Sequence, residues 1–208
     1  GLGETFGSKN TPNLVSKLAE IKIVQVAAGS NHSLCLSDTG QVYAFGEGVH
    51  GAVGQGNTTA ISEPKIVQGA LEGVCVKFIA CGACHSLAIS DKQQLYAWGK
   101  NSCAQLGIGG TVPQLSPAEV TACPKIVQAT GGYDHSLGLT EDGMVYSWGS
   151  GYNNAPVCGH GNGARVLVPT RIEALVNHEI VLIASGWDHN LVVTKEGLLF
   201  TWGDDPGG

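Results

Sequence analysis

The sequence predicts an all-β fold, a β-propeller built of four-stranded blades, because two motifs recur along its 208 residues with a common period. The first motif is Gly-x-x-His followed by Ser or Asn and then Leu, and its histidines are His32, His85, His135 and His189. The second motif is an aromatic residue followed by glycine, and its aromatic residues are Phe45, Trp98, Trp148 and Trp202. Successive copies of both motifs are 53, 50 and 54 residues apart, so one structural unit repeats through the chain.

Each unit contains short bursts of apolar residues that predict strands and are too short for helices. In the first complete unit they cover residues 23–28, 32–36 and 41–45, and across the units they are rich in Val, Ile, Tyr and Trp. Asp38-Thr39-Gly40 separates two bursts and favours a hairpin turn, because Asp and Gly tolerate positive φ. A fourth burst contains a proline, Pro64 in this unit, which suits an edge strand. Four strands in a unit of about fifty residues are typical of a propeller blade.

The motif positions also predict the boundaries of the repeats. Residues 23–74, 75–125 and 126–179 form three complete repeats. Residues 1–22 form the second half of a preceding repeat, and residues 180–208 form the first half of a following one. We expect these segments to make up one partial propeller domain, an excerpt of a longer chain.

The composition argues against several classes of partner. The chain has 11 Lys and Arg against 17 Asp and Glu, a formal net charge of −6, so direct binding of nucleic acid is not expected. No apolar run reaches about 18 residues, the length that a membrane-spanning helix needs, so no membrane contact is expected. Seven cysteines, an odd number, indicate free thiols in a reducing compartment. We therefore expect a cytoplasmic or nuclear location.

The repeated histidines and aromatic residues are interpreted as structural, because a catalytic residue would not be needed in four copies. We expect the four histidines to form hydrogen bonds between blades or with neighbouring carbonyl groups. We expect the four aromatic side chains to pack between adjacent blades, with the following glycine allowing a close approach of backbone. No catalytic, cofactor-binding or metal-binding residue is predicted.

Two local motifs resemble cofactor sites, but the repeat explains both. Cys81-Gly82-Ala83-Cys84-His85 matches a haem-attachment or zinc-binding pattern, yet it lies in the register of the other three histidine motifs. Residues 46–53 match a glycine-rich nucleotide loop, yet Gly54-Gln55-Gly56 follows them and cannot begin the helix that a dinucleotide site needs. We therefore expect no cofactor.

Taken together, the patterns A-x-G-x-x-H-S-L, D-x-G-x-V-Y-x-W-G and x-L-G-x-G resemble the repeat of the regulator of chromosome condensation (RCC-type) family. The resemblance covers essentially the whole chain. It implies a seven-bladed propeller, of which this chain holds about four blades. In this family the propeller is also found attached to ubiquitin-ligase, kinase or BTB domains.

The main functional prediction is a protein–protein interaction module of a larger intracellular protein. The alternative, implied by the founding family member, is a guanine nucleotide exchange factor for a Ran-like small GTPase. Whether the chain has enzymatic activity stays open, because exchange needs no acid–base residues. The expected partner is a small GTPase, a ubiquitin-ligase substrate, or a cytoskeletal or regulatory protein.

The loops that follow the aromatic-Gly pairs are the predicted contact surface, because propeller function resides in loops and not in the fold. The units differ most from one another in these loops. The residues predicted to bind a partner are Glu47, His50, Lys100, Asn101, Tyr152, Asn153, Asp204 and Asp205.

Overall fold

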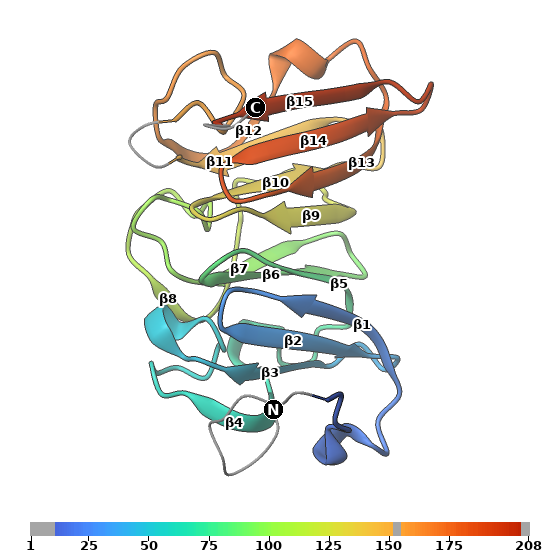
Figure 1. Cartoon of the computed structure of the whole chain (residues 1–208), viewed down its shortest axis with the longest axis vertical. Helices are drawn as coiled ribbons and strands as arrows, with labels where there is room; N and C mark the ends of the chain where they lie inside the picture. Colours follow the sequence, from blue (N-terminus) through green and yellow to red (C-terminus); the bar gives the residue numbers. More distant parts are fainter. Residues whose placement is uncertain (1–10, 152–154, 205–208) are drawn as a thin grey trace.

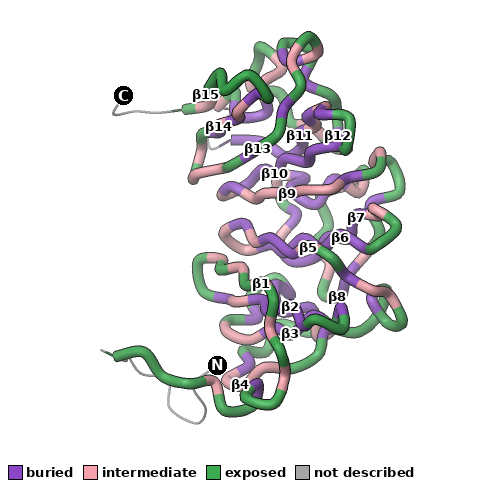
Figure 2. The backbone as a smooth tube through the Cα atoms, turned by 90° about the vertical axis from the view of Figure 1, so that its right-hand side faces the viewer, coloured by how far each residue is buried: buried purple, intermediate pink, exposed green. Residues whose placement is uncertain are grey.

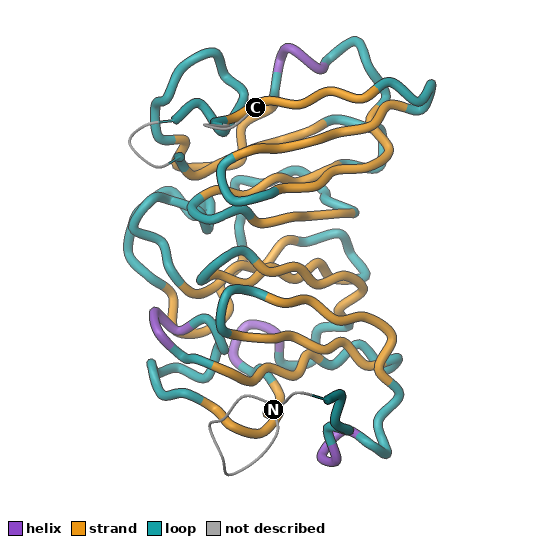
Figure 3. The backbone as a smooth tube through the Cα atoms, viewed as in Figure 1, coloured by secondary structure: helices purple, strands orange, loops and turns teal. Residues whose placement is uncertain are grey.

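The chain folds into four antiparallel β-sheets stacked one after another in chain order (Figure 1). The computed structural model describes residues 11–151 and 155–204. Strands and loops account for nearly all of this part, and the helical segments are single short turns (Figure 3). The prediction of an all-β fold made of propeller blades is confirmed.

Three sheets have four strands, and the fourth sheet has three strands within the described residues. The first sheet consists of β1 (Ile23–Ala28), β2 (His32–Ser37), β3 (Val42–Gly46) and β4 (Ile61–Ile66). The second consists of β5 (Val76–Cys81), β6 (His85–Ser90), β7 (Leu95–Gly99) and β8 (Gln114–Glu119). The third consists of β9 (Gln128–Gly131), β10 (His135–Leu139), β11 (Val145–Gly149) and β12 (Val166–Arg171). The fourth consists of β13 (Ile180–Ser185), β14 (His189–Thr194) and β15 (Leu199–Gly203). Short 3-10 turns occur at η1 (Ser16–Leu18), η2 (Val49–Gly51), η3 (Gly69–Leu71) and η5 (Glu173–Leu175).

The strand register explains why the two sequence motifs keep a fixed distance. The histidine that begins the second strand of each sheet pairs with the glycine that ends the third strand, as in His85 and Gly99. Gly99 has a φ of +102°, and a Cβ at this position would lie 2.6 Å from the carbonyl oxygen of Cys84. A larger residue would therefore separate the two strands where they pair.

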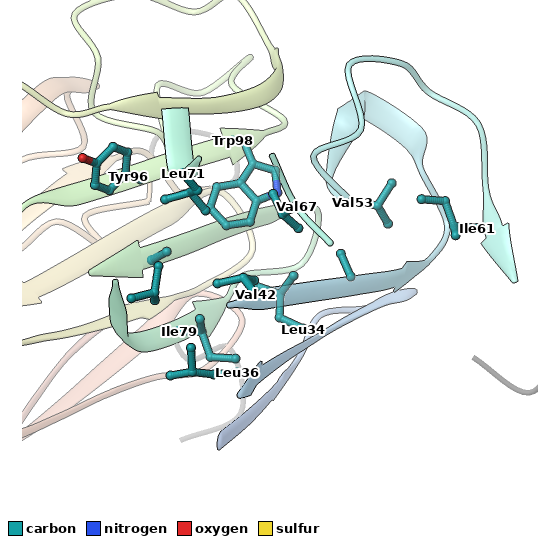
Figure 4. Close-up of a cluster of buried hydrophobic side chains, with 13 residues drawn as sticks. Leu34, Leu36, Val42, Val53, Ile61, Val67, Leu71, Ile79, Tyr96 and Trp98 are labelled. Atoms are coloured by element: carbon teal, nitrogen blue, oxygen red, sulfur yellow. The ribbon is translucent and has the colours of Figure 1, made fainter. Parts of the chain in front are cut away.

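The hydrophobic core lies between successive sheets (Figure 2). In the first interface, Leu34 and Val42 of the first sheet pack against Ile79 and Trp98 of the second (Figure 4). Trp98 is fully buried there, as Trp148 is in the next interface. Burying one large apolar side chain contributes about 1.5–3 kcal/mol, so packing between the sheets stabilises the fold.

A hydrogen-bonded relay crosses the interface between the second and third sheets. Nε2 of His85 lies 2.8 Å from Oγ of Ser136, and that hydroxyl donates to the carbonyl of Gln105 at 2.8 Å. Nε1 of Trp148 donates to the same carbonyl at 2.8 Å. Since the only hydroxyl proton of Ser136 goes to Gln105, the proton shared with the imidazole must come from Nε2 of His85. The carbonyl of Gln105 thus links His85 of one repeat, through Ser136, to Trp148 of the next repeat.

The same relay recurs in the other two interfaces. His32 bonds to Ser86, which donates to the carbonyl of Ala52 beside Trp98, with distances of 2.9, 2.8 and 2.9 Å. His135 bonds to Asn190, which donates to the carbonyl of Val157 beside Trp202, with distances of 2.8, 2.8 and 2.9 Å. His189, on the last sheet, is exposed. Phe45, on the first sheet, packs against a small cluster that includes Leu18 of the segment before β1.

The glycine three residues before each histidine makes room for the imidazole. A Cβ on Gly82 would overlap the ring of His85 and would lie 2.6 Å from the carbonyl oxygen of Gly132 in the next sheet. The Gly-x-x-His spacing is therefore a packing requirement between blades.

Substituting Ser136 by Ala should destabilise the chain by about 1–3 kcal/mol, because Nε2–H of His85 and the carbonyl of Gln105 both lose a buried partner. The free energy of unfolding in urea measures the loss. Ser116→Ala is the matched control, since no hydrogen bond is formed by the Ser116 side chain within the described residues, and it should change the stability by less than about 0.5 kcal/mol. Equal losses in the two variants would contradict the relay.

Candidate functional site

One end of each of the first three sheets carries the long loops, and this end of the molecule is here called the loop face. The turn from the first to the second strand and the loop from the third to the fourth both emerge there, because His32 pairs with Gly46 at that end. In the second sheet these segments are residues 82–84 and 100–113. The opposite edge carries short hairpin turns such as residues 38–41. Figure 3 shows the longer loops on the left and the hairpin turns on the right.

The inner turns of the four sheets meet on the loop face around a hollow of about 270 Å³. Three backbone hydrogen bonds join them in sequence. The amides of Ser30, Ala83 and Tyr133 donate to the carbonyls of Ala83, Gly132 and Trp187, at 3.0, 3.0 and 2.9 Å. The backbone of this inner ring is thus fixed from one blade to the next, whereas the side chains that follow its glycines differ.

Two aromatic side chains of this ring stack on each other. The rings of Tyr133 and Trp187 have centroids 4.3 Å apart and planes inclined by 5°. Nζ of Lys100 lies over the Tyr133 ring, 5.0 Å from its centroid. Because Trp187 covers the other face of that ring, the ammonium group and the indole lie on opposite sides of Tyr133. Trp187 is 62% exposed, so its indole is a large apolar surface open to a partner.

An ion pair holds the lysine of this group in place. Nζ of Lys100 lies 2.8 Å from Oδ1 of Asp134, which also accepts a hydrogen bond from Nε2 of Gln105 at 2.6 Å. Partial burial opposes the charge on Lys100, but the hydrogen bond and the negative charge of Asp134 outweigh it and raise the pKa of the ammonium group. The ion pair is largely buried, with side chains 19% and 9% exposed, so it fixes one loop of the second blade against the third.

Most of the predicted partner-binding residues within the described part are on the loop face. Glu47 is exposed and accepts a hydrogen bond from Nδ2 of Asn31 at 2.7 Å. His50 and Asp204 are exposed, and Lys100 is half-buried in its ion pair. Three further predicted residues, Tyr152, Asn153 and Asp205, lie outside the described residues.

The structure corrects the prediction for Asn101, which is fully buried. Nδ2 of Asn101 donates to the carbonyls of Gly110 and Val112, at 2.9 and 3.1 Å. Its Oδ1 accepts a hydrogen bond from the amide of Leu106 at 3.0 Å. All of its polar atoms are used to close the 100–113 loop on itself, so Asn101 shapes the loop and does not face a partner.

The stacked residues Tyr133 and Trp187 were not among the predicted contact residues. A signal for them was present, because each follows the first glycine of its Gly-x-x-His motif. Side chains at equivalent positions of adjacent repeats lie side by side on a propeller face. Two aromatic residues at this position in successive repeats therefore indicate a stack.

The buried histidines and three of the cysteines are held in their neutral forms. Burial lowers the pKa of His32 to about 4 and that of His85 to about 3, and it also lowers the pKa of His135. Burial raises the pKa of the Cys81, Cys123 and Cys158 thiols to about 12, which makes them poor nucleophiles at neutral pH. Nε2 of His85, in the motif that matches a haem site, is bonded to Ser136.

Within the described residues, no three His, Cys, Asp or Glu side chains are grouped so that they could hold a metal ion. None of the helical turns in this part of the chain has the length and apolar character needed to span a membrane.

The model of the RCC1-like domain matches residues 1–208, the whole chain. The chain belongs to the RCC1-like domain family. This RCC1-like domain is 35% identical over 197 residues to the ultraviolet-B receptor UVR8 of Arabidopsis thaliana, covering 93% of the chain and 44% of UVR8. It is 33% identical over 202 residues to the human E3 ubiquitin-protein ligase HERC2, covering 95% of the chain and 4% of HERC2. The chain thus spans less than half of each relative.

A solved structure shares the fold of this RCC1-like domain. Prp20p of Saccharomyces cerevisiae, studied together with its binding to Gsp1p and histones, superposes with a TM-score of 0.71 at 25% identity. The superposition covers 79% of this chain and 42% of Prp20p. The resemblance inferred from the repeated motifs is confirmed.

Lowering the pH from 7 to 5 should destabilise the domain. Because burial lowers the pKa values of His32, His85 and His135, the unfolded chain binds protons below pH 6.5 that the folded chain does not. The free energy of unfolding should fall by up to about 1.4 kcal/mol per pH unit for each of these histidines, until the pH reaches the folded pKa. Urea titrations at several pH values measure this slope.

The variant His85→Gln should have a shallower slope, whereas Ser116→Ala should keep the wild-type slope. A slope unaffected by removal of the His85 imidazole would show that its burial does not suppress its protonation.

Proposed function

We propose that this RCC1-like domain is a protein-interaction module of a larger intracellular protein and that its loop face makes the contact. The observation that carries the proposal is the exposed indole of Trp187 on a backbone ring that is fixed by hydrogen bonds. Exposed aromatic residues on a rigid support are typical of protein interfaces, because they add contact area at little cost in conformational entropy. A cytoplasmic or nuclear site of action is part of the proposal and agrees with seven free cysteines.

The relatives support a modular role. In HERC2, named as a ubiquitin-protein ligase, the matching segment is 4% of the protein, so a domain of this kind occurs there alongside much additional sequence. A ubiquitin-ligase substrate, a small GTPase or a cytoskeletal or regulatory protein would each fit an interaction module of this kind.

Changing exposed loop-face residues should reduce partner binding without unfolding the domain. The double variant Glu47→Ala, His50→Ala removes two exposed side chains from the loop that contains η2. Recovery of bound proteins by the full-length protein, quantified by mass spectrometry, should fall by about threefold or more for specific partners. The matched control, Lys92→Ala with Glu141→Ala, changes two exposed residues on the hairpin-turn side and should leave recovery unchanged. Equal recovery from all three proteins would argue against the loop face.

A second candidate is guanine nucleotide exchange on a Ran-like small GTPase, which the resemblance implies and the similarity to Prp20p supports. Exchange works by displacing nucleotide with a binding face and needs no catalytic acid or base. The test adds the full-length protein to a small GTPase loaded with fluorescent GDP and follows nucleotide release. Acceleration over intrinsic release supports exchange, and release at the intrinsic rate across a panel of Ran-like GTPases ends this proposal.

A further inference from the structure

Two asparagines occupy equivalent places in the long loops of the first and third blades. Asn57 lies four residues before β4, and Asn162 lies four residues before β12. Each follows a glycine with positive φ, Gly56 at +74° and Gly161 at +77°. Both asparagines are exposed. The loop face therefore presents the same kind of turn twice, which allows the chemistry of the two asparagines to be compared within one chain.

The side chains of these asparagines form matching hydrogen bonds with the backbone. Oδ1 of Asn162 accepts a hydrogen bond from the amide of Ala164 at 2.9 Å. Oδ1 of Asn57 accepts one from the amide of Thr59 at the same distance. Nδ2 of each asparagine donates to the carbonyl two residues earlier, at 3.4 Å for Asn162 and 3.2 Å for Asn57. Each turn is thus folded around its own asparagine side chain.

The two turns differ in the residue that follows the asparagine. Thr58 follows Asn57, whereas Gly163 follows Asn162 in the only Asn-Gly pair of the sequence. A threonine has a branched Cβ that crowds its own backbone nitrogen and restricts rotation of the chain beside it. Glycine has no Cβ, so its backbone nitrogen is free to approach the side-chain carbonyl carbon of the preceding residue.

We propose that Asn162 is a site of spontaneous deamidation, through which the loop face gains a negative charge as the protein ages. A base in the solvent removes the amide proton of Gly163, and the backbone nitrogen then forms a bond to Cγ of Asn162. The bond between Cγ and Nδ2 breaks, and Nδ2 takes a proton from water and leaves as ammonia. Water then opens the resulting succinimide ring at one of its carbonyl groups, which leaves aspartate or isoaspartate in place of the asparagine.

The turn assists this attack at one atom. Negative charge develops on Oδ1 of Asn162 as the nitrogen adds to Cγ, and the amide of Ala164 already donates a hydrogen bond to that oxygen. A backbone N–H placed at the oxygen that becomes charged stabilises the tetrahedral intermediate. The same bond is present at Asn57, so the residue that follows the asparagine is the feature that separates the two turns.

Asn101 provides a second comparison, because a small residue, Ser102, follows it. Asn101 is fully buried, and its Nδ2 is held by the carbonyls of Gly110 and Val112. Its side chain is fixed on both sides, since Oδ1 is bonded to the amide of Leu106. Asn101 is therefore expected to be protected, although its sequence alone resembles a reactive site.

The test incubates the full-length protein at mildly alkaline pH and quantifies peptides that contain Asn57, Asn101 or Asn162 by mass spectrometry. Conversion of the amide to an acid increases the peptide mass, and fragmentation distinguishes aspartate from isoaspartate. We expect Asn162 to be converted at least about tenfold faster than Asn57 or Asn101, with both products formed. A parallel sample unfolded in urea gives the rate of each asparagine without the fold.

Exchanging the following residue should exchange the reactivity. Gly163→Thr should slow the conversion of Asn162 by about tenfold or more, and Thr58→Gly should speed that of Asn57 by a similar factor. Thr58 is exposed, so its substitution should leave the fold intact and keeps the test valid if Gly163→Thr disturbs its own loop. The urea unfolding midpoint verifies that each variant is folded.

The proposal is overturned if Asn162 of the folded protein reacts no faster than Asn57, or if Asn162 reacts only in the urea-unfolded sample. The second outcome would show that the folded loop keeps the nitrogen of Gly163 away from Cγ. An unchanged rate at Asn57 in folded Thr58→Gly would likewise contradict the assigned role of the following residue. None of these measurements depends on partner binding, so they are independent of the proposed function.

Discussion

The structure depends on one interaction that is repeated between blades, the hydrogen bond from a buried histidine to the Ser or Asn of the next sheet. Apolar packing alone would tolerate small shifts between two sheets, because it is not directional. A buried imidazole, a hydroxyl and a carbonyl satisfy one another only when the two blades are in one register. In the central interface, the carbonyl of Gln105 accepts from both Ser136 and Trp148, so the polar relay and the aromatic core are aligned by a single atom. The histidine is neutral because a charged imidazole in this position would lose its hydration.

Because each relay needs the neighbouring blade, the residues that join blades differ from the exposed loop side chains in how tightly they are constrained. Each relay is completed by the following blade, and His85 is fully buried within its relay. The residues that join blades are therefore constrained by geometry on both sides. Exposed loop-face side chains such as Glu47 and His50 carry no such constraint, and the inner turns are held by hydrogen bonds between backbone groups. Substitutions of these exposed side chains should therefore leave the packing between blades intact.

The period of the sequence predicted the fold well because propeller packing is local. The histidine and aromatic-Gly motifs are cross-strand partners, so their constant spacing encodes the register of each sheet.

The candidate site was predicted less well. Asn101 looked like an exposed loop residue because Asn is common in solvated turns, but its amide is consumed by backbone groups of its own loop, and no local pattern distinguishes the two cases. The stack of Tyr133 on Trp187 joins residues from different repeats and becomes visible only when equivalent positions are compared.

The inner ring is uneven, because its four equivalent positions carry different side chains. The residues after the motif glycines are Ser30, Ala83, Tyr133 and Trp187, two small side chains followed by two aromatic ones. The backbone bonds that join the four turns are alike, so the ring accepts either kind of side chain without a change in fold. The aromatic half also carries the carboxylates Asp134 and Asp188, whereas the first two blades have Asn31 and Cys84 there. Aromatic and acidic side chains therefore concentrate on the part of the inner ring formed by the third and fourth blades, although the backbone scaffold repeats from blade to blade.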